Sequence, residues 1–213
     1  MTTTSWALLA LTLAFAVTDW WAVWAERPTV RYVTKPATLT FLIGVAVTLT
    51  PASSTIRTWM VIGLVLSLAG DVFLMLPEKW FVAGLGAFLL GHIAYIVGLQ
   101  LAPTSLGWTL VGLVVVVVCV AIVGARVVRG VAAGDQRDMV VPVIAYLVVI
   151  TAMVVSAWGT AAPWAIAGAT SFYASDATLA WNRFLEPRRF GPLAVMVAYH
   201  LGQIGLVAWL VHG

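Results

Sequence analysis

Charged residues are scarce in this chain. Asp, Glu, Lys and Arg together make up 9% of its 213 residues, while hydrophobic residues make up 62%. A soluble domain carries roughly 25% charged residues, because polar groups have to cover its surface. The composition therefore excludes an ordinary soluble domain and favours an integral membrane protein whose partner is the lipid bilayer. We expect no nucleic-acid partner.

Several kinds of catalytic site also lack their usual residues. The single cysteine, Cys119, excludes a disulfide within the chain, and it lies in an apolar run that disfavours a reactive thiolate. The three histidines stand on separate segments, and no His-Glu-x-x-His pattern occurs. The Gly-x-Ser-x-Gly pattern of serine lipases is missing as well. The sequence thus predicts neither a metal nor a cofactor.

Long apolar segments dominate instead. A membrane-spanning helix needs about 20 apolar residues, so the length accommodates about eight spans with short connections. We predict an all-α, polytopic bundle that forms one transmembrane domain over residues 1–213. Its first segment has no basic residue before it, so we expect a retained helix and not a cleaved signal peptide. The predicted helices cover about 5–24, 34–50, 58–76, 81–101, 106–125, 140–158, 164–184 and 191–211.

Proline and tryptophan support this division. Ten of the eleven tryptophans lie within about five residues of a predicted helix end, as in the aromatic belts of membrane proteins. Pro36, Pro142 and Pro192 fall in predicted first turns, which tolerate proline. The other prolines fall in the predicted connections, where a missing N–H costs least. These are Pro28, Pro51, Pro77, Pro103, Pro163 and Pro187.

Basic residues gather on one side of the predicted bundle. Of the eleven Lys and Arg residues, Arg57 alone lies on the side that also holds both termini. Because cytoplasmic loops carry the excess of Lys and Arg, we expect both termini to be extracytoplasmic. In a bacterium the protein would lie in the plasma (inner) membrane. The ten on the other side are Arg27, Arg31, Lys35, Lys79, Arg126, Arg129, Arg137, Arg183, Arg188 and Arg189.

A few ionisable residues lie inside the predicted spans, where they are costly and therefore candidates for function. Asp71 and Asp176 stand out, because at 1.5 Å per residue they lie roughly 8–12 Å below the basic end of the bundle. Asp19 and Lys35 lie shallower on the same side, either as an ion pair between the first two helices or as part of a substrate site. His92 and His200 lie nearer the middle.

Helical spacing aligns the polar residues into stripes. The stripes join Ser67 to Asp71, His92 to Tyr95, Ser175 to Asn182, and Tyr199 to Gln203. Gly84, Gly91 and Gly98 form a separate stripe that favours close helix packing. We expect the helices at 34–50, 58–76, 81–101, 164–184 and 191–211 to surround one pocket. The helices at 106–125 and 140–158 should lie peripherally.

The ordered set of these motifs resembles the lysoplasmalogenase (YhhN-like) membrane proteins. The likeness covers Thr-Lys-Pro at 34–36, the segment 68–76 with Gly-Asp at 70–71, and the segment 84–95 with Gly-His at 91–92. It continues with Ser-Asp at 175–176 in the segment 175–184, and with Tyr-His-Leu-Gly-Gln at 199–203. The segments 5–24, 106–125 and 140–158 show no clear likeness.

The resemblance implies hydrolysis of the vinyl ether bond of a lysoplasmalogen, a lysophospholipid, to a fatty aldehyde and glycerophosphoethanolamine or glycerophosphocholine. Acid cleaves a vinyl ether, so a proton donor and an anion that stabilises the resulting cation suffice. Asp71 and Asp176 can divide these catalytic roles. The predicted substrate-binding residues are Lys35 (toward the lipid phosphate), His92, Tyr95, Ser175, Asn182, Tyr199 and Gln203.

Three other functions fit parts of the pattern. A small transporter or proton-coupled carrier could use the same aspartates as a relay. An intramembrane aspartyl protease also uses two aspartates, but Leu68 stands where the first glycine of its Gly-x-Gly-Asp motif belongs. A structural scaffold leaves the buried carboxylates unexplained.

Overall fold

Eight helical rods account for the chain in the computed structural model, which describes residues 2–212. No strand occurs among these residues. The helices are α1 (Thr3–Trp24), α2 (Pro28–Thr48), α3 (Ser54–Met75), α4 (Phe81–Gln100), α5 (Leu106–Cys119), α6 (Ala125–Ala133), α7 (Val140–Gly159), α8 (Pro163–Phe184) and α9 (Gly191–His212). A π-helical turn, η2 (Val120–Gly124), joins α5 and α6 into one rod, and the 3₁₀ turns η1 (Glu78–Trp80) and η3 (Arg137–Met139) precede α4 and α7.

Six of the rods are long and apolar enough to cross a membrane, which confirms the predicted polytopic membrane fold. The other two, α2 and α8, are as long, with 21 and 22 residues. Their mean hydropathy is lower because they carry polar side chains, among them Lys35 and Asp176. Both rods thus bring a charged side chain into the bundle, as α1 and α3 do with Asp19 and Asp71.

Two predicted helix boundaries were wrong. The second helix begins at Pro28 and not near residue 34, because proline suits the first position of a helix, where its missing N–H has no partner to lose. Pro36 consequently lies inside α2. The rod predicted to end near residue 125 continues through η2 and α6 to Ala133. This extension carries Arg126 and Arg129, which hydropathy alone assigns to a loop.

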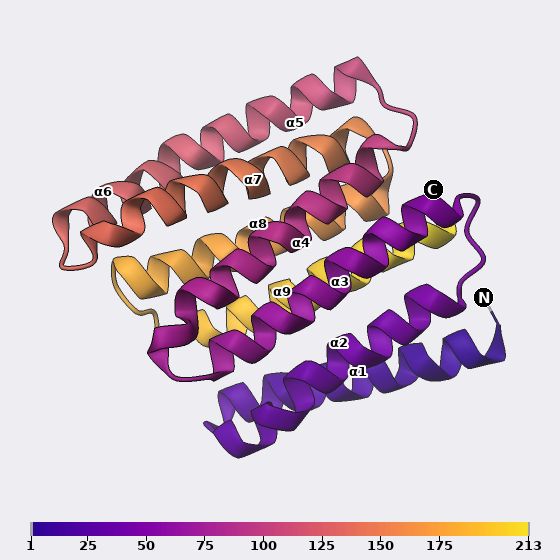
Figure 1. Cartoon of the computed structure of the whole chain (residues 1–213), viewed down its shortest axis with the longest axis horizontal. Coiled ribbons are helices and arrows are strands. Elements are labelled where there is room, and N and C mark those ends of the chain that lie inside the picture. The colour runs from indigo at the N-terminus through magenta and orange to yellow at the C-terminus, as the bar shows by residue number, and fades with distance from the viewer. Residues whose placement is uncertain (1, 213) are drawn as a thin grey trace.

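Both termini lie at one end of the bundle (Figure 1). The connections at 25–27, 76–80, 134–139 and 185–190 lie at the opposite end, which we call the basic end. Ten of the eleven Lys and Arg residues lie in these connections or in the helical turns next to them. The two ends thus differ strongly in their content of Lys and Arg, while the predicted orientation in the membrane stays a prediction.

Glycine allows neighbouring helices to pack closely. A Cβ atom on Gly168 of α8 would lie 2.6 Å from the backbone nitrogen of Leu206 in α9, and one on Gly202 would lie 2.8 Å from the nitrogen of Phe172. Between α3 and α4, a Cβ on Gly91 would lie 3.1 Å from the carbonyl oxygen of Gly63. Such contacts replace the hydrophobic driving force that helices lack within lipid. The predicted packing role of Gly91 is confirmed.

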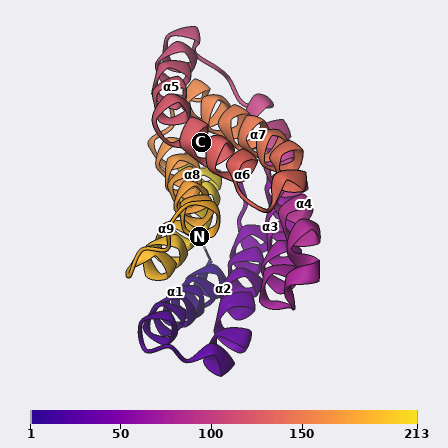
Figure 2. The ribbon, with the colours of Figure 1, turned by 90° about the vertical axis from the view of Figure 1, so that its left-hand side faces the viewer.

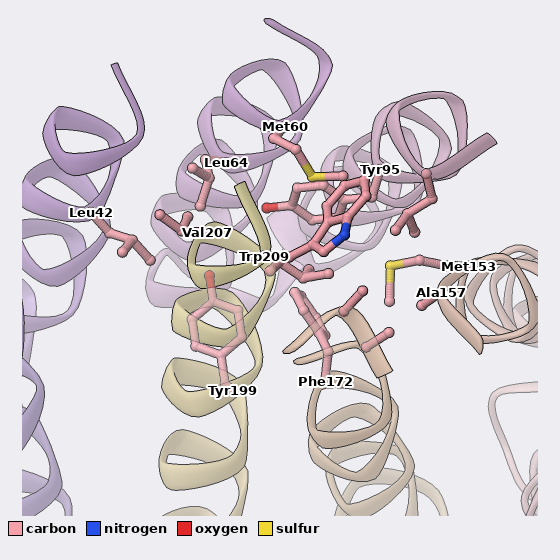
Figure 3. Packing of buried hydrophobic residues seen from close by; sticks show 14 of the residues in the cluster. Leu42, Met60, Leu64, Tyr95, Met153, Ala157, Phe172, Tyr199, Val207 and Trp209 are labelled. Carbon is pink, nitrogen blue, oxygen red and sulfur yellow. The ribbon is translucent and has the colours of Figure 1, made fainter. Parts of the chain in front are cut away.

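The helices form two facing groups (Figure 2). The pair α8 and α9 faces α3, α4 and α7, with the α1–α2 pair at one side and the α5–α6 rod at the other. Buried aromatic and aliphatic side chains fill the space between the groups, as Figure 3 shows for Tyr95, Phe172, Tyr199 and Trp209. A second, smaller cluster lies near the basic end and is built on Val127, Val131, Met139 and Val143.

Candidate functional site

A cavity near the basic end draws residues from most of the bundle. The empty space between its lining atoms, including its open part, is about 970 Å³. Both predicted catalytic residues, Asp71 and Asp176, line it, as do Lys35, Ser175 and Tyr199. The remaining lining is mostly apolar: Leu74, Phe81, Leu85, Phe88, Val123, Gly124, Val127, Val143, Tyr146, Leu147, Ile150, Tyr173, Ala177, Leu179, Ala180, Arg183, Phe184, Val195 and Met196. The predicted shared pocket therefore exists.

Asp71 is the centre of a buried polar network. It is four residues from the end of α3, and its side chain is buried. The Lys35 ammonium lies 2.9 Å from Asp71 Oδ1, and the Tyr199 hydroxyl donates a hydrogen bond of 2.7 Å to Oδ2. The cation of Lys35 also lies 5.9 Å from the centre of the Tyr199 ring. Both oxygens of Asp71 thus have a partner, one of them cationic.

Asp176 has different partners and is more open. Its side chain is 15% exposed, against 1% for Asp71. The Tyr146 hydroxyl donates a 2.5 Å hydrogen bond to Asp176 Oδ2, and the same hydroxyl lies 2.9 Å from His92 Nε2. The distance from His92 Nε2 to Asp176 Oδ2 is 3.4 Å. A phenol and an imidazole therefore surround this carboxylate, and both can carry or pass a proton.

Aromatic rings separate the two networks. Phe172 packs edge-to-face on His92, at 4.7 Å between ring centres, and on Tyr199, at 5.2 Å. Phe88 adds a second contact to Tyr199 at 5.9 Å. The described residues contain no hydrogen bond that links one carboxylate network to the other. The two acids thus share the cavity but keep separate, low-dielectric surroundings.

Some predicted substrate-binding residues lie away from the cavity. Tyr95 and Gln203 bond to each other, with 2.6 Å between the phenol oxygen and Oε1, in the core beyond the lining. Asn182 accepts a hydrogen bond from the backbone nitrogen of Arg188 and thereby holds the α8–α9 turn. His92 does not line the cavity and acts on it through Asp176. Ser175 lines it and donates its hydroxyl hydrogen to the Val195 carbonyl.

The considered pair of Asp19 with Lys35 does not form. Asp19 accepts a 2.9 Å hydrogen bond from Thr34 and lies 3.8 Å from Arg31 Nε, while Lys35 turns to Asp71. On α2, Arg31 lies one helical turn nearer the basic end than Lys35. Arg31 contacts Asp19, and Lys35 contacts Asp71. The expected contact of Lys35 with a lipid phosphate stays a prediction, and it would compete with the buried pair that Lys35 forms with Asp71.

Tyr146 was not among the predicted site residues, and its helix α7 lies closer to the cavity than expected. The segment 140–158 was predicted to be peripheral, yet α7 contributes Tyr146, Leu147 and Ile150 to the cavity. The other peripheral segment also contributes, through Val123 and Gly124 of the π-helical turn. A signal for Tyr146 was present: it is the one tyrosine in an otherwise strongly apolar span. Its significance depends on Asp176, thirty residues away, which no local pattern indicates.

No metal site accompanies the two carboxylates. Among residues 2–212, no group of three or more His, Cys, Asp and Glu side chains is arranged to hold a metal ion. The chemistry available from these side chains is proton transfer and electrostatic stabilisation in an apolar cavity.

The chain is similar in sequence to a membrane-protein family and to several proteins named lysoplasmalogenase. The model of the YhhN family matches residues 30–210. Lysoplasmalogenase TMEM86B of Mus musculus is 31% identical over 153 residues, which are 70% of this chain and 62% of that protein. Lysoplasmalogenase of Mycobacterium bovis is 34% identical over 168 residues, 74% of this chain and 62% of that protein. Lysoplasmalogenase TMEM86B of Homo sapiens is 32% identical over 143 residues, 66% of this chain and 58% of that protein.

The matched region thus spans about 62% of the length of the first two relatives. No solved structure matches the chain. The family match covers most of the sequence, including every helix that contributes a polar group to the cavity. The chain is therefore a multi-pass membrane protein that belongs to the YhhN family.

Proposed function

We propose that this protein is a lysoplasmalogenase, which hydrolyses the vinyl ether bond of a lysoplasmalogen within the membrane. The observation that carries the proposal is that Asp71 and Asp176 line one largely apolar cavity. The names of the relatives support the choice of substrate. The products are a fatty aldehyde and glycerophosphoethanolamine or glycerophosphocholine.

The reaction begins with a proton. Transfer of a proton to the β-carbon of the vinyl ether forms a C–H bond from the double-bond electrons and leaves an oxocarbenium ion. Water adds to the α-carbon and gives up a proton, which yields a hemiacetal. The hemiacetal hydroxyl then gives up its proton to form the aldehyde carbonyl, while the bond to the glycerol oxygen breaks and this oxygen takes a proton. The site must therefore donate a proton, stabilise a cation and accept a proton from water.

The two networks suit different roles in this sequence. The ammonium of Lys35 and the hydroxyl of Tyr199 stabilise Asp71 as an anion, because opposite charge and hydrogen-bond donors both favour the ionised carboxylate. Asp71 is thus assigned to stabilise the cation and to accept the proton from water. Asp176 also accepts a hydrogen bond from a phenol, but no lysine or arginine of the described chain pairs with it, so it is assigned as the proton donor. Oxocarbenium chemistry in glycosidases divides two carboxyl groups in the same way.

The apolar lining suits the hydrocarbon chain of the substrate. Val123, Val127 and Leu147 belong to this lining, so the hydrocarbon chain of the lipid can lie beside η2, α6 and α7. The basic end then lies at the membrane surface where the head group resides. The excess of Lys and Arg at this end favours a position of the basic end at the cytoplasmic surface, in a bacterium that of the plasma membrane.

The catalytic assignment predicts that Asp71→Asn and Asp176→Asn each lower aldehyde release from lysoplasmalogen by at least about a thousandfold, as for other residues that act as one unit. The double variant should be scarcely worse than either single one. The assay uses purified protein in detergent, with Asp138→Asn as the control, because Asp138 is an exposed aspartate of the basic end.

Near-normal aldehyde release from either cavity variant, at normal yield and monodispersity, would refute the two-aspartate mechanism. A carrier with the same aspartates would release no aldehyde even as the wild type, but would show proton-coupled uptake in vesicles.

The orientation has its own test. With both termini extracytoplasmic, a reporter fused after Gly213 that is active only in the cytoplasm stays silent. The same reporter inserted in the connection at 134–139 should be active, which controls for expression. A strong signal from the fusion after Gly213 would reverse the orientation and put the cavity near the other leaflet.

A further inference from the structure

The cavity needs a cation for a phosphate, and Lys35 is not available for this purpose. Four charged residues line the cavity within the described chain: Lys35, Asp71, Asp176 and Arg183. Lys35 is paired with Asp71 at 2.9 Å, and its side chain is only 6% exposed. A phosphate that bound Lys35 would have to take it from a buried carboxylate, which is costly. Arg183 is the other cation of the lining.

Arg183 lies in a setting that leaves its hydrogen-bonding capacity partly unused. Its guanidinium carbon lies 4.6 Å from the centre of the Phe81 ring, which holds the planar group in place. Its Nη2 bonds to Glu78 of η1, but its Nε is buried and has no hydrogen-bond partner. A buried N–H without a partner costs free energy, and a ligand oxygen would remove this cost.

The partner of Arg183 can be exchanged easily. The Glu78 side chain is 70% exposed and that of Arg183 is 29% exposed, so water solvates both charges and their pair contributes little. A phosphate presents two oxygens that can accept two parallel N–H hydrogen bonds from the guanidinium of an arginine. Replacement of the carboxylate by a phosphate therefore costs little and satisfies Nε as well.

The position of Arg183 also matches the shape of the substrate. Arg183 follows Asp176 by seven residues on α8, so both lie on the same face of the helix, two turns and about 10.5 Å apart. In a lysoplasmalogen, three glycerol carbons and one oxygen separate the vinyl ether oxygen from the phosphorus, which is a shorter span than this rise. The long side chain of Arg183, which in a helix leans toward the N-terminus and so toward Asp176, would cover the difference. Arg183 is on the side of the basic end, where the head group would lie.

On the basis of the proposed function, we propose that Arg183 binds the phosphate of the lysophospholipid and that Glu78 is the carboxylate this phosphate displaces. Arg183 is thus the residue that makes a phosphorylated head group part of the recognised substrate. It also sets the depth of the vinyl ether beside Asp176. Glu78 acts as a competitor for the same guanidinium.

The test measures binding with lipids that cannot be cleaved, so that it remains valid if the proposed hydrolysis fails. The probes are hexadecyl-lysophosphatidylcholine, which has a saturated ether, and hexadecylglycerol, which lacks the phosphate. Arg183→Gln should weaken binding of the phosphorylated lipid about tenfold or more, the usual scale for a charge-assisted hydrogen bond. It should leave binding of hexadecylglycerol unchanged. Arg183→Lys, which keeps the charge but not the fork, should fall between.

The Glu78 variant distinguishes recognition from a structural latch. Glu78→Gln should strengthen binding of the phosphorylated lipid several-fold, because Arg183 loses its competitor. A latch that merely holds α8 to η1 would make both variants weaken both lipids alike, which would overturn the proposal. Arg126→Gln is the matched control, since Arg126 is exposed near the basic end, bonds its own helix at Ile122 and does not line the cavity.

Free phosphate provides the last arm of the test. Inorganic phosphate lacks the chain that fills the apolar part of the cavity, so it should displace the phosphorylated lipid only at concentrations far above that of the lipid. Displacement at equal concentrations would overturn the assignment to a lipid head group. Unchanged binding of the phosphorylated lipid by Arg183→Gln would overturn it too, even if aldehyde release from lysoplasmalogen is established.

Discussion

The two aspartate networks of the cavity differ in almost every respect. Asp71 is almost completely buried, and its two oxygens contact the ammonium of Lys35 and the hydroxyl of Tyr199. Asp176 is partly open, and a phenol and an imidazole that can move protons surround it. The difference teaches that two like residues at similar depth need not be equivalent. Partners from distant helices give Asp71 a lysine and a phenol, and give Asp176 a phenol and an imidazole.

The largest difference should appear in stability. Asp71→Asn leaves the buried ammonium of Lys35 without a counter-ion, which costs about 3–5 kcal/mol. Asp176→Asn removes a carboxylate that pairs with no lysine or arginine of the described chain, and it should leave the free energy of unfolding nearly unchanged. Thermal unfolding in detergent measures the contrast.

A second substitution sharpens this contrast. Lys35→Met together with Asp71→Asn removes both charges of the pair, so the thermal stability lost in the single variant should return. Activity should not return, because the anion is still missing. Equal unfolding temperatures for Asp71→Asn and Asp176→Asn would contradict the assigned difference between the networks.

A smaller contrast is expected for the two tyrosines. Tyr146→Phe removes the hydroxyl that orients Asp176 and should lower kcat about tenfold to a hundredfold, because a misplaced proton donor is inefficient. Tyr199→Phe removes a bond to an acid that still has Lys35. It should therefore lower stability by about 1–3 kcal/mol, with a smaller loss of kcat.

Kinetics and thermal unfolding of both tyrosine variants are to be compared with Tyr173→Phe. Tyr173 lines the same cavity and, in the part of the chain that the structure describes, forms no hydrogen bond with either carboxylate, so this variant should behave like the wild type. If Tyr146→Phe keeps full kcat while Tyr199→Phe loses it, the roles of the two aspartates are reversed.

Residue patterns along the chain were informative about depth. The positions of Asp71 and Asp176 relative to their helix ends follow from counting residues, and both lie near the basic end as predicted. The stripe containing Tyr199 and Gln203 was less informative, because it did not show which of them faces the cavity. A helical stripe identifies one face of a helix. Which neighbours this face meets depends on how the helix is rotated about its axis, and contacts with other helices set this rotation.

The sequence by itself determined that this protein is an all-helical membrane protein and, for most rods, roughly where they lie. It also singled out Asp71 and Asp176 by their depth, and their catalytic roles stay a proposal. These features depend on hydropathy and on helical rise, which are local properties. The tertiary structure alone decided that Lys35 pairs with Asp71 and not with Asp19, and that Tyr146 joins Asp176. Such pairings depend on which helix faces which, and small residues such as Gly168 and Gly202 set those contacts through shape, far from the charges they bring together.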